Sequence, residues 1–297
     1  MGDDCVRQGR MFWDYIVLAI KGVCMGAADV VPGVSGGTIA FVTGIYQELV
    51  NSIKSINLSL FALLFRGKVI SFWRRLNGGF LLAVICGILL SIFSLAKLML
   101  YLLDEHPIPV WSFFTGLVVA SAIYVLKPLK GVNVWSWLWL ALGIILAVVV
   151  CRLSPVETPN GYWFLFLTGA IAICAMILPG ISGSFIMLLM GKYVVIMEAV
   201  TNLYWDVLLV FAAGAVVGIV SFSHLLSWML KTYYNQTVCL LAGFMFGSIV
   251  KIWPWKGMHL GVGAPPAQWG TGVLFIVLGF GVVFGVEFLA KRMQQAK

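Results

Sequence analysis

The sequence predicts an all-α polytopic membrane protein built from two inverted-topology repeats, each a re-entrant helical hairpin followed by three transmembrane helices. Of the 297 residues, 62% are hydrophobic and 10% are charged, whereas a typical soluble domain has about 25% charged residues. The mean hydropathy is +1.03, so most of the chain is apolar enough to lie in a bilayer. A motif that occurs once in each half of the chain indicates the repeat.

The repeated motif is the main sign of internal duplication. It reads ADVVPGVSGGT at residues 28–38 and AMILPGISGSF at residues 175–185. Pro32 and Pro179 are 147 residues apart, and the same offset gives nine identities in the 25 positions from Gly22 to Tyr46. Interrupted helices at corresponding positions of two halves are typical of transporters, in which they form a binding site near the bilayer midplane.

Lys21 places a charge near the middle of the apolar stretch that starts at Phe12, so repeat 1, residues 1–151, is expected to begin with an interfacial stretch and then a re-entrant hairpin over about residues 22–49. Because ten helical residues rise only about 15 Å, the helix that ends at the Pro32–Gly33 break spans half of the hydrocarbon core. A second half-helix, from about Gly36 to Leu49, then returns to the same side.

The rest of repeat 1 is predicted to contain an interfacial segment and three spans. Residues 51–78 mix five Lys and Arg residues with Leu, Phe and Trp, which indicates an amphipathic segment in the headgroup plane. Three apolar stretches long enough to cross the hydrocarbon core predict transmembrane helices at 79–103, 109–127 and 135–151.

Repeat 2, residues 152–297, is expected to follow the same order without the interfacial segment. A re-entrant hairpin at 162–201 precedes predicted spans at 205–230, 236–252 and 269–290. Because each hairpin returns to its own side, each repeat crosses the membrane three times, and the odd number inverts the second repeat.

The distribution of basic residues predicts the sidedness. In this topology, 14 of the 19 Lys and Arg residues lie on the side of the N-terminus, so the positive-inside rule places both termini in the cytoplasm. The same rule, together with contact to anionic membrane lipids, explains the formal net charge of +8 without nucleic acid as a partner.

The sequence indicates no metal, no cofactor and no catalytic group. Its six cysteines are scattered singly, without a CxxC pair or a Cys/His cluster, so neither a metal site nor a disulfide framework is expected. We find no nucleotide-binding motif, and therefore expect no ATP-driven step.

The motif has the residues of an anion site at a break between two helices. Pro32 and Gly33 interrupt the helix, and Ser35 is a favourable N-cap for the next helix. The following N–H groups then lack helical acceptors and point into the protein with the positive end of the helix dipole. Structural kinks that serve close packing are the alternative. The predicted anion-binding residues of the two motifs are Gly33, Ser35, Gly36, Gly37 and Thr38, with Gly180, Ser182, Gly183 and Ser184.

Two carboxylates are candidates for coupling transport to an ion. Asp29 ends the first half-helix, where burial and the negative end of the helix dipole both disfavour its ionised form. An intramembrane carboxylate is a functional candidate, so we expect Asp29 to take up a proton or pair with a cation; capping of the local loop is the alternative. Its counterpart in the second motif is Met176. Glu48 lies near the point where the hairpin returns to the cytoplasmic face. Its carboxylate either takes part in ion coupling or is simply solvated, and the sequence leaves both roles open.

Two cations and one histidine complete the candidates. Arg152 and Lys192 are predicted towards the outer face, where they either attract an anionic headgroup or anchor the chain at the interface. His224 lies inside the predicted span 205–230 and is interpreted as a hydrogen-bonded packing residue.

The motifs carry a family resemblance. GAADVVPGVSGGTIAFVTGIY at 26–46, with ILPGISGSFIMLLMGKY at 177–193, resembles the bacterial membrane family formerly described only as a domain of unknown function. That family is now described as polyprenyl-phosphate (undecaprenyl-phosphate) transporters of the PopT type. The resemblance covers essentially the whole chain and implies two re-entrant hairpins in inverted repeats.

The resemblance implies a non-enzymatic flippase of the bacterial plasma membrane. It would return undecaprenyl phosphate from the outer to the cytoplasmic leaflet, for reuse in peptidoglycan and other envelope glycan synthesis, with protons or a cation as coupling partner. The anion site then becomes a phosphate site. The residues carried over from the family motif are Asp29, Pro32, Gly33, Ser35, Gly36, Gly37 and Thr38, with Pro179, Gly180, Ser182, Gly183 and Ser184.

Two other functions are compatible with the motif. Some small-anion channels and exchangers also direct paired helix ends at chloride. The sequences GVSG and GISG match the GxSG motif of rhomboid-type intramembrane serine hydrolases, with His224 as a candidate base. A hydrolase needs a single nucleophile, however, whereas this serine occurs twice.

Overall fold

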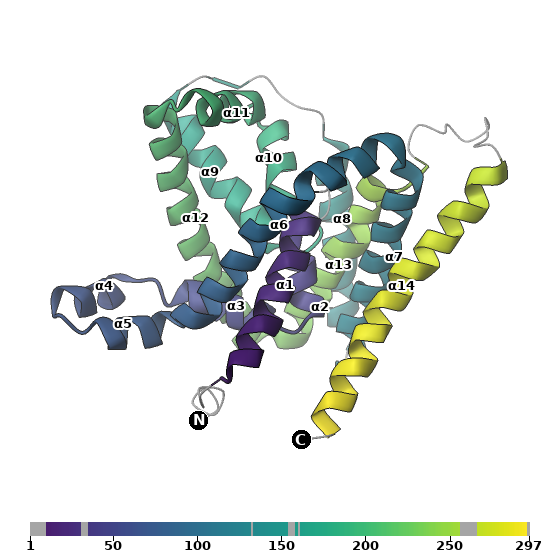
Figure 1. The fold of residues 1–297 in the computed structure, drawn as a ribbon, viewed down its shortest axis with the longest axis horizontal. Coiled ribbons are helices and arrows are strands. Elements are labelled where there is room, and N and C mark those ends of the chain that lie inside the picture. The colour runs from purple at the N-terminus through teal and green to yellow at the C-terminus, as the bar shows by residue number, and fades with distance from the viewer. Residues whose placement is uncertain are drawn as a thin grey trace.

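The computed structural model describes residues 10–30, 35–131, 133–153, 158–159, 161–255 and 266–295. In that part of the chain all the regular structure is helical (Figure 1). The helices are α1 Phe12–Val30, α2 Gly36–Val42, α3 Tyr46–Lys54, α4 Leu58–Phe65, α5 Val69–Leu76, α6 Gly78–Glu105, α7 Pro107–Leu126, α8 Val134–Arg152, α9 Tyr162–Ile177, α10 Gly183–Leu189, α11 Tyr193–Asn202, α12 Trp205–Thr232, α13 Tyr234–Ile252 and α14 Pro266–Gln295.

Six of these helices are long and apolar enough to cross a membrane: α6, α7, α8, α12, α13 and α14. Each of them overlaps one of the predicted spans; α6, for example, contains residues 79–103. Two bent helix pairs raise the number of candidate spans among the described residues to as many as eight. The chain is therefore an all-helical polytopic membrane protein.

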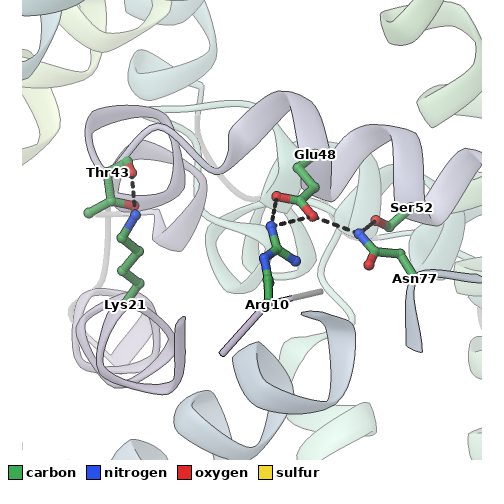
Figure 2. A network of polar contacts seen from close by, with 6 residues as sticks. All are labelled: Arg10, Lys21, Thr43, Glu48, Ser52 and Asn77. Atoms are coloured by element: carbon green, nitrogen blue, oxygen red, sulfur yellow. Dashed lines mark hydrogen bonds and ion pairs between the residues drawn. The ribbon is translucent and has the colours of Figure 1, made fainter. Parts of the chain in front are cut away.

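The first helix corrects the prediction of a half-length helix from about Gly22. α1 is one continuous helix of 19 residues from Phe12 to Val30. We expected an interruption because Lys21 places a charge near the middle of this apolar stretch. In the structure its Nζ donates a hydrogen bond to the carbonyl oxygen of Thr43 at 2.7 Å (Figure 2), so the charge has a partner within the helix bundle and the helix continues past it.

The second half-helix of the first hairpin is also shorter than predicted. Instead of one helix from Gly36 to Leu49, α2 ends at Val42 and α3 starts at Tyr46. Gly44 between them has φ +73°, and the equivalent Gly191 between α10 and α11 has φ +62°. Positive φ ends a helix and favours glycine, which explains why this glycine recurs in both motifs. The α10–α11 bend is 116°.

The segment predicted to be interfacial folds into two short helices. α4 and α5 project from the helix bundle, at the lower left of Figure 1. α5 has no buried residue and carries Arg74 and Arg75 in its last turn, while Phe61 of α4 contacts Phe72 of α5 with ring centroids 6.4 Å apart. We retain the prediction that this segment lies in the headgroup plane.

The long helices pack as closely spaced pairs. α1 packs on α6, α9 on α12, α8 on α13 and α7 on α14, and α7 also contacts α13. Glycines bring the backbones together: a Cβ at Gly143 of α8 would collide with the carbonyl oxygen of Leu240, and a Cβ at Gly243 of α13 with that of Leu140. Small residues at helix contacts are how membrane helices gain van der Waals packing without a hydrophobic driving force.

This packing predicts the effect of enlarging one glycine. We expect Gly243→Val to lower the free energy of unfolding by about 1–3 kcal/mol, because the added side chain forces α8 and α13 apart. Gly281→Val on α14 is the matched control, since among the described residues no atom lies within 4 Å of its Cβ position. Unfolding of the detergent-solubilised protein, followed by circular dichroism, measures both variants. Equal stability of the two would contradict the close approach of α8 and α13.

Candidate functional site

The two repeated motifs meet in the interior. Ser35, at the N-cap of α2, directs its hydroxyl at the C-terminal end of α9, where the carbonyl oxygens of Met176 and Leu178 lie 3.1 and 3.3 Å from Oγ. Ser35 is 1% exposed. A hydroxyl of the first motif therefore satisfies carbonyl groups that the end of α9 leaves without helical partners.

Two further hydrogen bonds join the motifs. The amide of Gly180 donates to Thr38 Oγ1 at 3.0 Å, and the Tyr46 hydroxyl donates to the carbonyl oxygen of Ile177 at 3.1 Å. Thr38 is fully buried and Tyr46 is 2% exposed. The two serine-bearing bends, 147 residues apart in sequence, are thus in direct contact. Pro32 and Gly33 lie outside the described residues.

The amides of the first bend are occupied, which corrects the expectation that they lack partners. The amide of Gly36 donates to Asp29 Oδ1 at 2.7 Å. The amide of Gly37 donates to Ser35 Oγ at 3.1 Å, and that of Thr38 to the Ser35 carbonyl oxygen at 2.9 Å. Asp29 folds back over Gly36 because glycine leaves room: a Cβ there would lie 2.5 Å from Oδ2. The Asp29 carboxylate is therefore the acceptor for one of the amides that the sequence predicted to be without a partner.

The second bend has the same shape but lacks the carboxylate. Met176 stands where the first bend has Asp29, and a Cβ at Gly183 would collide with its Cγ. A thioether is only a weak hydrogen-bond acceptor. Among the described residues, no acceptor contacts the amides of Gly183, Ser184 and Phe185. The predicted set of bare amides is therefore found in the second bend alone.

The second bend also carries two hydroxyl groups, and a cation lies against its phenylalanine ring. Ser182 and Ser184 share a hydrogen bond of 2.7 Å between their hydroxyls. The Nζ of Lys251, in the last turn of α13, lies 4.0 Å from the centroid of the Phe185 ring. The second bend thus combines amide donors, two hydroxyls and a positive charge, which is the chemistry of an anion site.

Lys251 is not among the site residues predicted from the sequence, where it counted only towards the sidedness. A signal was present, because a lysine inside a predicted span is a functional candidate. The sequence does not show that α13 packs on the second motif. In the structure the two are in contact, because a Cβ at Gly180 would lie 3.0 Å from Ser248 Oγ, and Ser248 lies one turn before Lys251 on α13.

Glu48 is held in a polar network at the start of α1 (Figure 2). Both its carboxylate oxygens accept hydrogen bonds from Arg10 Nη2, at 2.8 and 2.6 Å. Asn77 Nδ2 donates to Glu48 Oε1 at 2.7 Å and contacts Ser52 Oγ at 3.2 Å. Because the carboxylate joins the starts of α1 and α6 to α3, this geometry favours a structural role over ion coupling.

The remaining candidates lie apart from the bends. Arg152 is exposed at the end of α8. Lys192 is 1% exposed, and its Nζ donates to the Thr158 carbonyl oxygen at 3.0 Å, so it does not face a headgroup. His224 Nδ1 lies 2.8 Å from the carbonyl oxygen of Val220 in its own helix, as expected of a packing histidine. Among the described residues, no cluster of His, Cys, Asp and Glu could hold a metal ion.

Comparison with known proteins identifies the family. Residues 25–263 match the model of the undecaprenyl phosphate translocase-like family. The chain belongs to this family. It is 49% identical over 243 residues to a "Polyprenyl-phosphate transporter" of Vibrio cholerae serotype O1, a match that covers 82% of this chain and 79% of the relative. A second relative with the same name, from Staphylococcus aureus, is 30% identical over 279 residues, or 88% and 92% of the two chains. No solved structure matches the chain significantly.

Family membership bears on the functions left open by the sequence. Both relatives are named transporters, and the hydrolase alternative also lacks the geometry it needs. The Ser35 hydroxyl is directed at carbonyl oxygens of α9, and the His224 ring bonds within its own helix, whereas a serine nucleophile must bond to its base.

The hydrogen bond from the Gly180 amide to the Thr38 hydroxyl predicts the effect of replacing that hydroxyl with a methyl group. We expect Thr38→Val to lower the free energy of unfolding by about 1–3 kcal/mol, because the buried amide of Gly180 loses its acceptor. Thr38→Ser keeps the hydroxyl and serves as the control. Chemical unfolding in detergent measures both variants. If the valine and serine variants were equally stable, this bond would not hold the bends together.

Proposed function

We propose that the protein transports a polyprenyl phosphate across the bacterial plasma membrane. The observation that carries the proposal is the junction of two motif bends from opposite halves of the chain, one of which offers amides, hydroxyls and Lys251 to an anion. The names of the relatives support the same substrate. The phosphate enters the junction, while the apolar chain stays in the surrounding lipid.

The topology proposed for this activity is a pair of inverted repeats with re-entrant bends. The packing of helices supports it, because exchange of the two repeats converts each pair into another observed pair: α1–α6 corresponds to α9–α12, and α7–α14 to α13–α8. The start of α1 and the end of α14 lie at the same end of the molecule (Figure 1). With 14 of 19 basic residues on that side, we assign it to the cytoplasm.

The proposed direction is from the outer to the cytoplasmic leaflet, with undecaprenyl phosphate as the lipid for recycling in envelope glycan synthesis. In the proposed topology Lys251, in the last turn of α13, lies on the outer side of the junction. The second bend therefore receives the phosphate first, with Ser182, Gly183 and Ser184 as its donors. The first bend, with Gly33, Ser35, Gly36, Gly37 and Thr38, receives it next. Anionic membrane lipids contact the basic cytoplasmic side.

Asp29 provides the proposed coupling to protons. Its carboxylate and a phosphate oxygen compete for the same amide, that of Gly36, and two anions repel each other at this distance. Protonation of Asp29 removes the repulsion and weakens its hold on the amide. A proton that enters with the lipid therefore opens the first bend. Glu48, bound to Arg10, stays in place during this step.

Reconstitution tests the transport itself. Purified protein in liposomes should move fluorescently labelled undecaprenyl phosphate between leaflets faster than protein-free liposomes, as measured by a membrane-impermeant quencher. Lower pH on the outer side should accelerate the exchange. Chloride or inorganic phosphate flux without lipid movement would instead identify a small-anion channel and reject the proposal.

The same assay tests the coupling residue. We expect Asp29→Asn to transport the lipid with little dependence on pH, because the amide resembles the protonated carboxyl group. Asp14→Asn is the control, since Asp14 caps the start of α1 through the amide of Met11 and lies far from the motif in sequence. A pH profile of Asp29→Asn identical to that of the unaltered protein would remove Asp29 from the coupling step.

The same assay tests whether Lys251 contacts the phosphate. We expect Lys251→Gln to raise the lipid concentration at half-maximal rate about tenfold, which corresponds to roughly 1.4 kcal/mol of lost interaction. Arg152→Gln removes a charge from the exposed end of α8 and serves as the control. Similar values for the two variants would mean that Lys251 does not contact the phosphate.

A further inference from the structure

A cavity of about 340 Å³ lies apart from the two bends. It is formed where α12 ends and where α8 and α13 begin, at the same end of the molecule as the start of α1 (Figure 1). None of its lining residues belongs to the repeated motif. They are Trp135, Trp139, Trp228, Met229, Tyr233, Gln236 and Thr237, and we refer to this site as the tryptophan cavity.

The walls of the tryptophan cavity are almost entirely apolar. Three indole rings, a phenol ring and a thioether face it, and the rings of Trp228 and Tyr233 are in edge-to-face contact with centroids 5.7 Å apart. The Thr237 hydroxyl is already bonded to the Tyr233 carbonyl oxygen at 2.8 Å. Apolar walls with few polar groups are typical of small-molecule sites, and the volume is near the lower end of their range of roughly 300–1,000 Å³.

Several of the residues that line the cavity are exposed, and we expect them to face the membrane. Trp135 and Trp228 are 67% and 52% exposed, and tryptophan is the residue that prefers the boundary between headgroups and hydrocarbon. A hydrocarbon chain can therefore enter from the bilayer. The volume fits a short section of a single chain, whereas a phospholipid brings two chains to the same place.

Two basic residues lie close to the lining of the tryptophan cavity, one by sequence and one by a backbone contact. Lys231 lies between Met229 and Tyr233 in sequence, and its side chain is exposed. Lys130 is also exposed and is held next to the cavity, because Asn235 Nδ2 donates to its carbonyl oxygen at 2.9 Å. No lining residue is acidic. Basic groups at the cytoplasmic ends of membrane helices bind anionic lipid headgroups.

We propose that the tryptophan cavity binds a polyprenyl monophosphate in the cytoplasmic leaflet, with its first isoprene units between the indole rings and its phosphate at Lys130 and Lys231. The site holds the lipid after it leaves the bends, which keeps it from returning. This inference rests on the proposed function. The chemistry recognised is a single branched, unsaturated chain that ends in a compact anion.

A photoreactive probe tests the proposal on the full-length protein. Farnesyl phosphate with a diazirine on its first isoprene unit is cross-linked to the protein in nanodiscs, and the labelled peptides are identified by mass spectrometry. We expect labels at the start of α8 and at the α12–α13 connection. Excess unlabelled farnesyl phosphate should remove them, whereas the same concentration of phosphatidylglycerol should not.

Variants separate the chain from the phosphate. Trp139→Leu should reduce labelling of the cavity about tenfold, and Met229→Trp, which fills the cavity, should do the same. Trp137→Leu is the matched control, because Trp137 lies on the same helix but does not line the cavity. Lys130→Gln with Lys231→Gln should reduce labelling by the phosphate probe but not by the corresponding photoreactive farnesol.

The outcomes distinguish this proposal from the transport function. Labels confined to the two bends, or equal competition by phosphatidylglycerol, would overturn the cavity site even if lipid exchange in liposomes is intact. Equal labelling of Trp139→Leu and Trp137→Leu would overturn it as well. If the unaltered protein neither exchanged the lipid between leaflets nor bound the probe, the proposed function itself would fail.

Discussion

The structure depends on one constraint: backbone groups at a break in a membrane helix must find partners inside the protein. The first bend supplies what the second lacks. The first motif provides the hydroxyls of Ser35, Thr38 and Tyr46, and the second provides the carbonyl groups at the end of α9 and the amide of Gly180. The amides of the first break are satisfied within the first half by Asp29 and Ser35. By contrast, the carbonyl groups and the Gly180 amide of the second break find their partners in the first half, so the second break depends on the first half.

The two bends are similar in shape and unequal in chemistry. Both bends place a glycine under the last turn of the preceding helix. In the first bend the side chain above Gly36 is the carboxylate of Asp29, and in the second bend the side chain above Gly183 is the thioether of Met176. Two identical anion sites would bind a phosphate equally well and give no preference for either side. An internal anion in only one of them makes the sites unequal, and because that anion is titratable, the difference between them depends on protonation.

The sequence predicts the large elements better than the contacts between them. The six long apolar helices follow from the length of a bilayer-spanning segment, and the paired motifs follow from direct repetition. The continuous α1 was missed because a charged Lys21 indicated an interruption, and only the folded chain shows that Thr43 accepts its hydrogen bond. The break after Val42 was present in the sequence as Gly44, a glycine repeated as Gly191, but its meaning required the observed positive φ.

In the candidate site, too, local features follow from the sequence and contacts between distant elements do not. Ser35 as an N-cap follows from local sequence, whereas the return of Asp29 onto Gly36 depends on how the chain turns between them. Lys251 and the tryptophan cavity depend on which helices pack together: α13 on the second motif, and α8 with the α12–α13 connection. Nothing in the spacing of Trp135 and Trp139 shows the space enclosed between α8 and its neighbours.

The way the helices are paired bears on how such a junction can open. Glycines bring the backbones of α1 and α6, and of α9 and α12, into direct contact, and we expect each pair to move as one body. The packing of α8 on α13 and of α7 on α14 joins the halves elsewhere, whereas at the bends the halves are joined by a few side-chain hydrogen bonds, each of which contributes about 0.5–1.5 kcal/mol. A phosphate group can replace them, since its oxygens accept from the same hydroxyls and amides. In the proposed mechanism, opening of the bends around a bound phosphate therefore costs less than opening of an empty junction, and the presence of the lipid favours opening.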